Sequence, residues 1–185
     1  KFFILPNQYW KHKNHFLILN ILKDIIFSKR NDVQIISTGN FNDSRFPEYK
    51  KEILEFIKKN NLSNNYKILG IIPYQDLMDL MHLSIAVINP SKSEGWSSTV
   101  EQGKSIGKMI LLSNLKVHKE QAPYRNFYFD PNKKNQIKKI IIKLHNEYSY
   151  KKEIRHKLIA QKQMNNLRKK FSKNYINYIE KLVHA

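Results

Sequence analysis

Short apolar runs alternate with longer amphipathic segments over residues 1–131, and this alternation constrains the fold more than any other feature. Strand-like apolar runs lie at residues 2–5, 33–37, 66–69, 84–89, 109–113 and 126–129. Between them, apolar residues recur at helical spacing in segments 15–30, 47–59 and 97–106, and in a segment that Pro73 opens. Strands that alternate with helices of this length favour a parallel sheet with helices on both faces, so we expect an α/β fold with about six strands.

The C-terminal segment differs from the rest in periodicity and in charge. Its pattern predicts helices over 136–148, 151–169 and 172–184, so we expect a single domain with a sheet core (1–131) and a helical tail (132–185). The tail holds 15 Lys and Arg against 3 Glu, a net charge of +12, whereas residues 1–131 hold 18 basic and 12 acidic residues, a net +6. The surplus is typical of solvated helix faces, and it also fits a surface that meets anionic lipid headgroups. Only 5 of the 33 basic residues are Arg, which disfavours nucleic-acid recognition.

The composition excludes several classes of protein. The chain has no Cys, so disulfides, Cys-based zinc sites and thiol catalysis are excluded. No apolar run approaches the roughly 18 residues that span a bilayer. We therefore expect a cytoplasmic protein, with a place at the inner face of the cytoplasmic membrane as the alternative. Because residues 1–6 contain no initiator Met, we also expect the chain to be a piece of a longer protein.

The loops that follow the strands are the places to search for a site. In open parallel sheets, ligands bind beyond the carboxyl ends of the strands, near a switch in strand order. Loop 90–102 is the most informative, because Glu94 and Gly95 precede a helix that Ser97, Ser98 or Thr99 can cap. A helix start of this kind offers free backbone N–H groups to phosphate, and a carboxylate beside it can accept hydrogen bonds from sugar hydroxyls. Taken alone, the same residues also fit an ordinary cap and a solvated loop.

Several loop motifs occur together in an order that resembles a known family. They are Pro90-Ser91-x-x-Glu94-Gly95-Trp96-Ser97 and the segments 6–15, 69–77, 107–110, 113–121 and 129–131. As a set they look like the nucleotide-sugar half of the family-four retaining glycosyltransferases, over residues 1–184. That family has the GT-B architecture of two Rossmann-like domains. The resemblance implies that this chain is the Rossmann-like donor-binding domain and that the N-terminal acceptor domain is absent from it.

The resemblance also implies a role for each matching position. It places Glu94 at the donor-sugar hydroxyls as the catalytic residue. It assigns the donor and its diphosphate to Asn7, Lys13, Gly95, Trp96, Ser97, Ser98 and Thr99, and the nucleoside to Gly70, Ile71, Ile72, Leu77 and Gln102. Two positions depart from the pattern: Gln102 stands where the family has a second Glu, and Asn7 or Gln8 stands where many members have an Arg. A neutral side chain can hydrogen-bond ribose or phosphate but lacks the strength that charge adds.

These observations lead to one expected function and two alternatives. We expect the donor-binding half of a hexosyltransferase-type enzyme that moves a sugar from a nucleotide diphosphate to a hydroxyl acceptor with retention, in bacterial surface polysaccharide or lipopolysaccharide synthesis. The isolated domain is expected to be inactive, and no metal or other cofactor is expected, since His12, His15 and His118 lack neighbouring ligands in the sequence. The alternatives are a GT-B-type nucleotide-sugar epimerase and a non-catalytic basic module that binds anionic lipid or nucleic acid.

Overall fold

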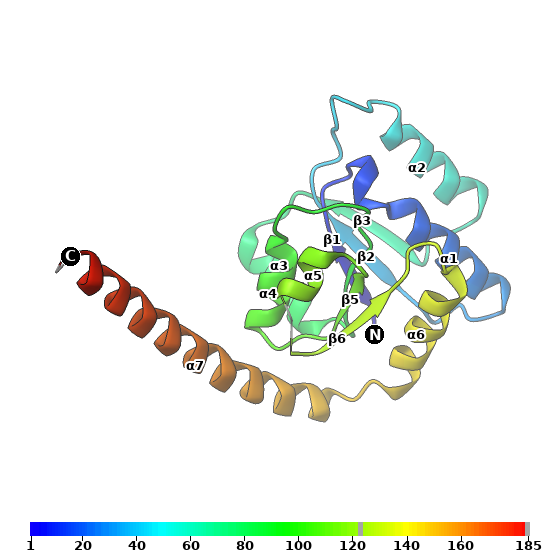
Figure 1. Ribbon diagram of the computed structural model, residues 1–185. Helices are drawn as coiled ribbons and strands as arrows, with labels where there is room; N and C mark the ends of the chain where they lie inside the picture. The colour runs from blue at the N-terminus through cyan, green and yellow to red at the C-terminus, as the bar shows by residue number, and fades with distance from the viewer. Residues whose placement is uncertain (122–123, 184–185) are drawn as a thin grey trace.

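The computed structural model describes residues 1–121 and 124–183, and its centre is a single parallel sheet (Figure 1). Its strands are β1 (Phe3–Pro6), β2 (Ile35–Thr38), β3 (Tyr66–Gly70), β4 (Val87–Asn89), β5 (Ile110–Ser113) and β6 (Asn126–Phe129). They are arranged in the order β3-β2-β1-β4-β5-β6, with every neighbouring pair parallel. The expected α/β fold with about six strands is therefore confirmed.

Helices cover both faces of this sheet. They are α1 (His15–Phe27), α2 (Tyr49–Lys59), α3 (Tyr74–Leu83), α4 (Ser98–Ser105), α5 (Lys116–Gln121), α6 (Lys134–Glu147) and α7 (Tyr150–Val183), with a short 3-10 turn η1 (Lys11–Lys13) before α1. The larger apolar core lies between the sheet and helices α1, α2 and α6, and includes Leu19, Ile53 and Ile141. A smaller core on the other face joins Ile4 and Val87 to Met81 and Val100 of helices α3 and α4.

The structure corrects two details of the sequence-based prediction. Segments 151–169 and 172–184 form one continuous helix, α7, instead of two; residue 184 lies outside the described residues. No Gly or Pro interrupts residues 150–183, so nothing in the local sequence ends the helix near Ser172. Helix α5, in contrast, was not predicted, because six residues are too few to show a helical repeat.

The two halves of α7 have different surroundings. Near its start, Glu153 accepts hydrogen bonds from Arg125 at 2.8 and 3.1 Å and from the buried Lys108 at 3.2 Å, which joins the helix to β5 and β6. Ala160 is buried against the turn at Gly107, where an added Cβ would lie 2.5 Å from the Ala160 methyl carbon. Beyond it, none of residues 161–183 is buried, and this half projects away from the sheet (Figure 1).

Strand order places the potential ligand site. Strands β1 and β4 are neighbours in the sheet although two strands separate them in sequence, so their connections leave toward opposite sides. The carboxyl ends of these two strands therefore open into the crevice where ligands bind in folds of this type. The loops that begin at Asn7 and at Pro90 meet there.

Candidate nucleotide-sugar site

A cavity of about 350 Å³ lies at the carboxyl ends of β1, β2 and β3 and the start of α4. Its lining consists of Pro6, Asn7, Gln8, Trp10, Lys13, Thr38, Gly39, Ile71, Ile72, Leu77, Ser98, Thr99 and Gln102. The cavity thus brings together eight of the site residues predicted from sequence: Asn7, Lys13, Ser98 and Thr99 from the donor group, and Ile71, Ile72, Leu77 and Gln102 from the nucleoside group. The residues of these two groups are far apart along the chain, and the fold brings them into one cavity.

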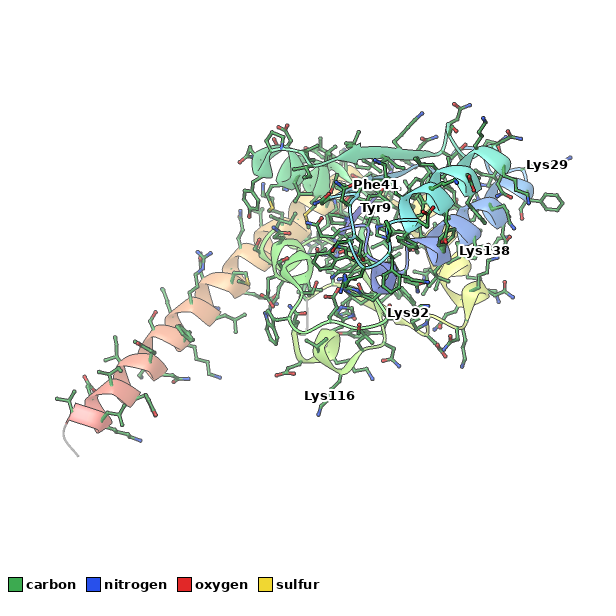
Figure 2. The ribbon with its side chains drawn as sticks, turned by 90° about the horizontal axis from the view of Figure 1, so that it is seen from above. Tyr9, Lys29, Phe41, Lys92, Lys116 and Lys138 are labelled. Carbon is green, nitrogen blue, oxygen red and sulfur yellow. The ribbon has the colours of Figure 1, made fainter. Side chains whose placement is uncertain are left out.

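The loop between β1 and α1 packs against the segment after β2. Gly39 has a φ of 130°, and a Cβ at this position would lie 2.5 Å from the carbonyl oxygen of Asn7, so only glycine allows the approach. The Tyr9 ring, which belongs to this loop, stacks on Phe41 at a centroid distance of 3.8 Å, and the two labelled residues lie close together (Figure 2). On its other side, the loop is joined to the segment after β4, because Lys92 N–H donates to the His12 carbonyl at 2.8 Å.

The charged pair of the site is Lys13 with Glu94. The Lys13 ammonium donates to both carboxylate oxygens of Glu94, at 2.7 and 2.8 Å. The two side chains are only 13% and 7% exposed, so the pair is largely shielded from water. Lys13 also lines the cavity, whereas Glu94 does not. The pair therefore connects the cavity to the predicted sugar-binding carboxylate next to it.

Hydrogen bonds keep Glu94 ionised in spite of its burial. Ser91 Oγ donates to Glu94 Oε1 at 2.7 Å, and Asn89 Nδ2 lies 3.4 Å from the same oxygen. Burial alone would raise the pKa of the Glu94 carboxyl, but the hydrogen bonds from Lys13, Ser91 and Asn89 outweigh it and hold this pKa below its ordinary value. At neutral pH the group is therefore a carboxylate that can only accept hydrogen bonds.

The start of α4 is fixed by buried polar side chains. Ser97 is its N-cap residue, and its Oγ accepts from Val100 N–H at 3.4 Å and from Asn89 Nδ2 at 2.9 Å. The Gln121 carboxamide accepts from the N–H of Ser97 at 3.3 Å and donates to its carbonyl at 2.9 Å. Thr99 Oγ1 donates to the Pro6 carbonyl at 3.1 Å. These contacts hold the free N–H groups of the helix start at the cavity, a suitable site for phosphate.

The remaining predicted residues do not line the cavity. Glu94 contacts the lining residue Lys13, and Ser97 directly precedes the lining residue Ser98. Gly70, with a φ of 70°, accepts a hydrogen bond at its carbonyl from the N–H of the lining residue Gly39 at 2.8 Å. Trp96 is 58% exposed, and Gly95 has open space at the place of a Cβ. Conversely, the lining residues Pro6, Trp10, Thr38 and Gly39 were missed, although all of them follow or end a strand whose loop was expected to carry the site.

Histidines contribute packing here. His15 is fully buried against the Tyr9 ring, and burial lowers the pKa of His15 to about 3, so it is neutral. His118 is also buried, and its Nδ1 lies 2.9 Å from the Ser113 carbonyl. Within residues 1–121 and 124–183, no group of three or more His, Asp and Glu side chains could hold a metal ion.

Comparison with known protein families identifies the family of this chain. The sequence profile of the family described as glycosyl transferases group 1 matches residues 1–165. The chain belongs to this family. No curated protein sequence matches the chain significantly.

Solved structures of similar fold include several glycosyltransferases. HepE of Anabaena in complex with UDP has a TM-score of 0.70 at 15% identity, over 91% of this chain and 48% of that chain. The HepE complex with UDP-glucose has a TM-score of 0.69 at 18% identity, over 86% and 42%. A glycosyltransferase from Rickettsia africae has a TM-score of 0.78 at 20% identity, over 97% and 47%. The expected fold, one half of a GT-B glycosyltransferase, is confirmed, and the chain spans about half the length of these structures.

Proposed function

We propose that this domain binds the nucleotide diphosphate sugar of a glycosyltransferase in the cavity between β1, β3 and α4. The observation that carries the proposal is the convergence of Lys13 and the α4 start with the apolar side chains of Ile71, Ile72 and Leu77 in one cavity. Lys13 and the helix N–H groups suit a diphosphate, and the apolar wall beside the exposed backbone of β3 suits a base. The bound UDP and UDP-glucose of HepE, a protein of the same fold, support this choice of ligand class.

Calorimetric titration of the 185-residue chain with UDP and with GDP tests the donor site. We expect one of them to bind, and we expect Lys13→Gln to weaken that binding. The matched control is Lys92→Gln, which removes an exposed lysine from the neighbouring loop. Absence of binding of both nucleotides at millimolar concentration would reject the site.

For the whole protein, we propose transfer of the sugar to a hydroxyl acceptor with retention at the anomeric carbon, in surface polysaccharide or lipopolysaccharide synthesis. An N-terminal domain would bind the acceptor, so this domain alone should turn over no substrate. Lys13 and the α4 dipole would stabilise the leaving diphosphate in place of a metal ion. Activity that persists in EDTA, with the α-linked product of an α-linked donor, would support both points. Product formed from a nucleotide sugar without any acceptor would instead favour an epimerase.

The exposed half of α7 supports a second proposal, a peripheral place at the inner face of the cytoplasmic membrane. One face carries apolar and aromatic side chains, among them Leu167, Phe171, Tyr175, Tyr178 and Leu182, all at least half exposed. Residues 161–183 hold six Lys and Arg against one Glu. A helix with these two properties can lie in an anionic lipid surface. No helix within the described residues is long and apolar enough to cross a membrane. Sedimentation with vesicles of phosphatidylglycerol and phosphatidylcholine tests the proposal. Equal sedimentation of the parent and of Phe171→Ser would contradict it, and the apolar face would then be a candidate for contact with another protein.

A further inference from the structure

The two oxygens of the Glu94 carboxylate are held unequally. Oε1 accepts hydrogen bonds from Ser91 Oγ and from Lys13 Nζ, both at 2.7 Å, and Asn89 Nδ2 lies 3.4 Å away. Oε2 accepts, within the described residues, from Lys13 Nζ at 2.8 Å. Loss of the Lys13 contact would therefore leave Oε1 held and Oε2 free.

Lys13 is the group whose ion-pair partner a bound ligand would change. Lys13 lines the cavity, and its ammonium already forms an ion pair with Glu94. A diphosphate in the cavity carries more negative charge than one carboxylate and would draw the same ammonium toward it. The two anions therefore compete for a single lysine.

Ser91 can keep its hydrogen bond to Glu94 when Lys13 moves away. Its hydroxyl is fully buried and stands 2.7 Å from both Glu94 Oε1 and Asn89 Oδ1, but it has one hydrogen to give. Asn89 Oδ1 has further donors within 3.4 Å, the Ser91 N–H and Asn7 Nδ2. The hydroxyl can thus turn fully to Glu94 without leaving Asn89 Oδ1 unpaired. Asn89, also fully buried, keeps its place through the Ser97 hydroxyl at 2.9 Å.

We propose that Ser91 and Asn89 are positioning residues that hold Glu94 in place while Lys13 turns from Glu94 to the donor diphosphate. This inference rests on the proposed donor site. In the exchanged state, Oε2 is free to accept a hydroxyl of the donor sugar, while Oε1 stays on Ser91 and Asn89. A nucleoside diphosphate alone separates the ion pair and leaves Oε2 without a partner, whereas a nucleotide sugar supplies that partner.

Calorimetry with a nucleoside diphosphate and its sugar conjugate separates the two steps, using UDP with UDP-glucose and GDP with GDP-mannose. We expect Glu94→Gln to bind the nucleoside diphosphate roughly three- to tenfold more tightly, because Lys13 is released from its ion pair. We expect Ser91→Ala to change nucleoside diphosphate affinity less than about twofold but to weaken the sugar conjugate roughly five- to tenfold. Asn89→Leu should likewise weaken binding of the sugar conjugate more than binding of the nucleoside diphosphate.

The controls are Ser84→Ala and Asn65→Leu. Each removes a buried hydrogen-bonding side chain of the same type far from the cavity, and neither should alter the ratio of the two affinities. If Asn89→Leu does not fold, Ser91→Ala carries the test.

Three results would overturn the inference. Equal weakening of both ligands by Ser91→Ala would mean a purely structural role, and weaker nucleoside diphosphate binding in Glu94→Gln would mean no competition for Lys13. Both leave the donor site intact. If neither nucleotide binds the parent chain, the donor site itself is wrong and the inference falls with it.

Discussion

The cavity at the strand ends and the exposed half of α7 use charge in opposite ways. Among the described residues that line the cavity, Lys13 carries the positive charge, and it is paired with Glu94 and shielded from water. In residues 161–183, six basic side chains surround an apolar stripe, and none of these residues is buried. The comparison teaches that the net charge of +18 says little about the site, because the arrangement of a few buried groups decides the chemistry.

The largest effect is expected where α7 is attached to the sheet. Glu153→Gln leaves Lys108 and Arg125 without their carboxylate, so we expect the free energy of unfolding to fall by about 3 kcal/mol. Chemical denaturation measures this. Glu180→Gln, in the exposed half of the same helix, should change stability by less than about 0.5 kcal/mol. Similar losses in both variants would mean that the two halves of α7 do not differ as described.

A second prediction concerns ligand binding. Lys13→Gln should weaken binding of the nucleoside diphosphate by roughly ten- to a hundredfold, because the charge-assisted bonds to phosphate are lost. In contrast, the triple variant Lys169→Gln, Lys170→Gln and Lys173→Gln removes three positive charges from α7 and should leave this affinity within about twofold. A strong loss in the triple variant would place the anion site on α7.

The stability of the cavity should depend on pH through Glu94. Because the folded-state pKa of Glu94 lies below the ordinary value of 4.5, its ionisation stabilises the fold above that pH. The contribution is lost as the pH falls through the lower folded-state pKa. Lys13 faces the carboxylate directly, and His12 and His118 also interact with it electrostatically.

Glu94→Gln should accordingly cost about 1 kcal/mol at pH 7, and the difference from the parent should be smaller at pH 3, because part of the contribution is lost below the ordinary pKa. Denaturation curves at both pH values measure it. Glu101→Gln, at a more exposed position of α4, serves as the control variant in the same measurement. A difference for Glu94→Gln that is the same at both pH values would show that its ionisation does not stabilise the fold.

The smallest effect is expected at Gln102. Gln102→Glu would place a charged acceptor at the cavity wall, where a ribose can be bound, and should tighten nucleotide binding by about two- to fivefold. Competition calorimetry against the parent measures the change. Because Gln102 lines the cavity and Glu101 does not, Glu101→Gln should leave the affinity unchanged.

The sequence alone predicted the part of the account that depends on periodicity. The six strand segments follow from the alternating apolar runs, and the functional segments that contain Lys13, Glu94 and Gln102 follow from motif resemblance. The contact between Asn89 and Asn7 was not predictable, because the two residues become neighbours only when β1 and β4 pair. Trp10 and Gly39 were missed for the same reason: their place at the cavity depends on contacts between loops that are distant in sequence.

The most direct test of the account is a titration of the isotopically labelled chain with UDP and GDP, followed by amide chemical shifts. We expect the amide shifts of Asn7, Lys13, Ser98, Thr99 and residues 70–72 to change, while those of 161–183 stay unchanged. Shifts confined to 161–183, or spread evenly over the basic surface, would contradict it.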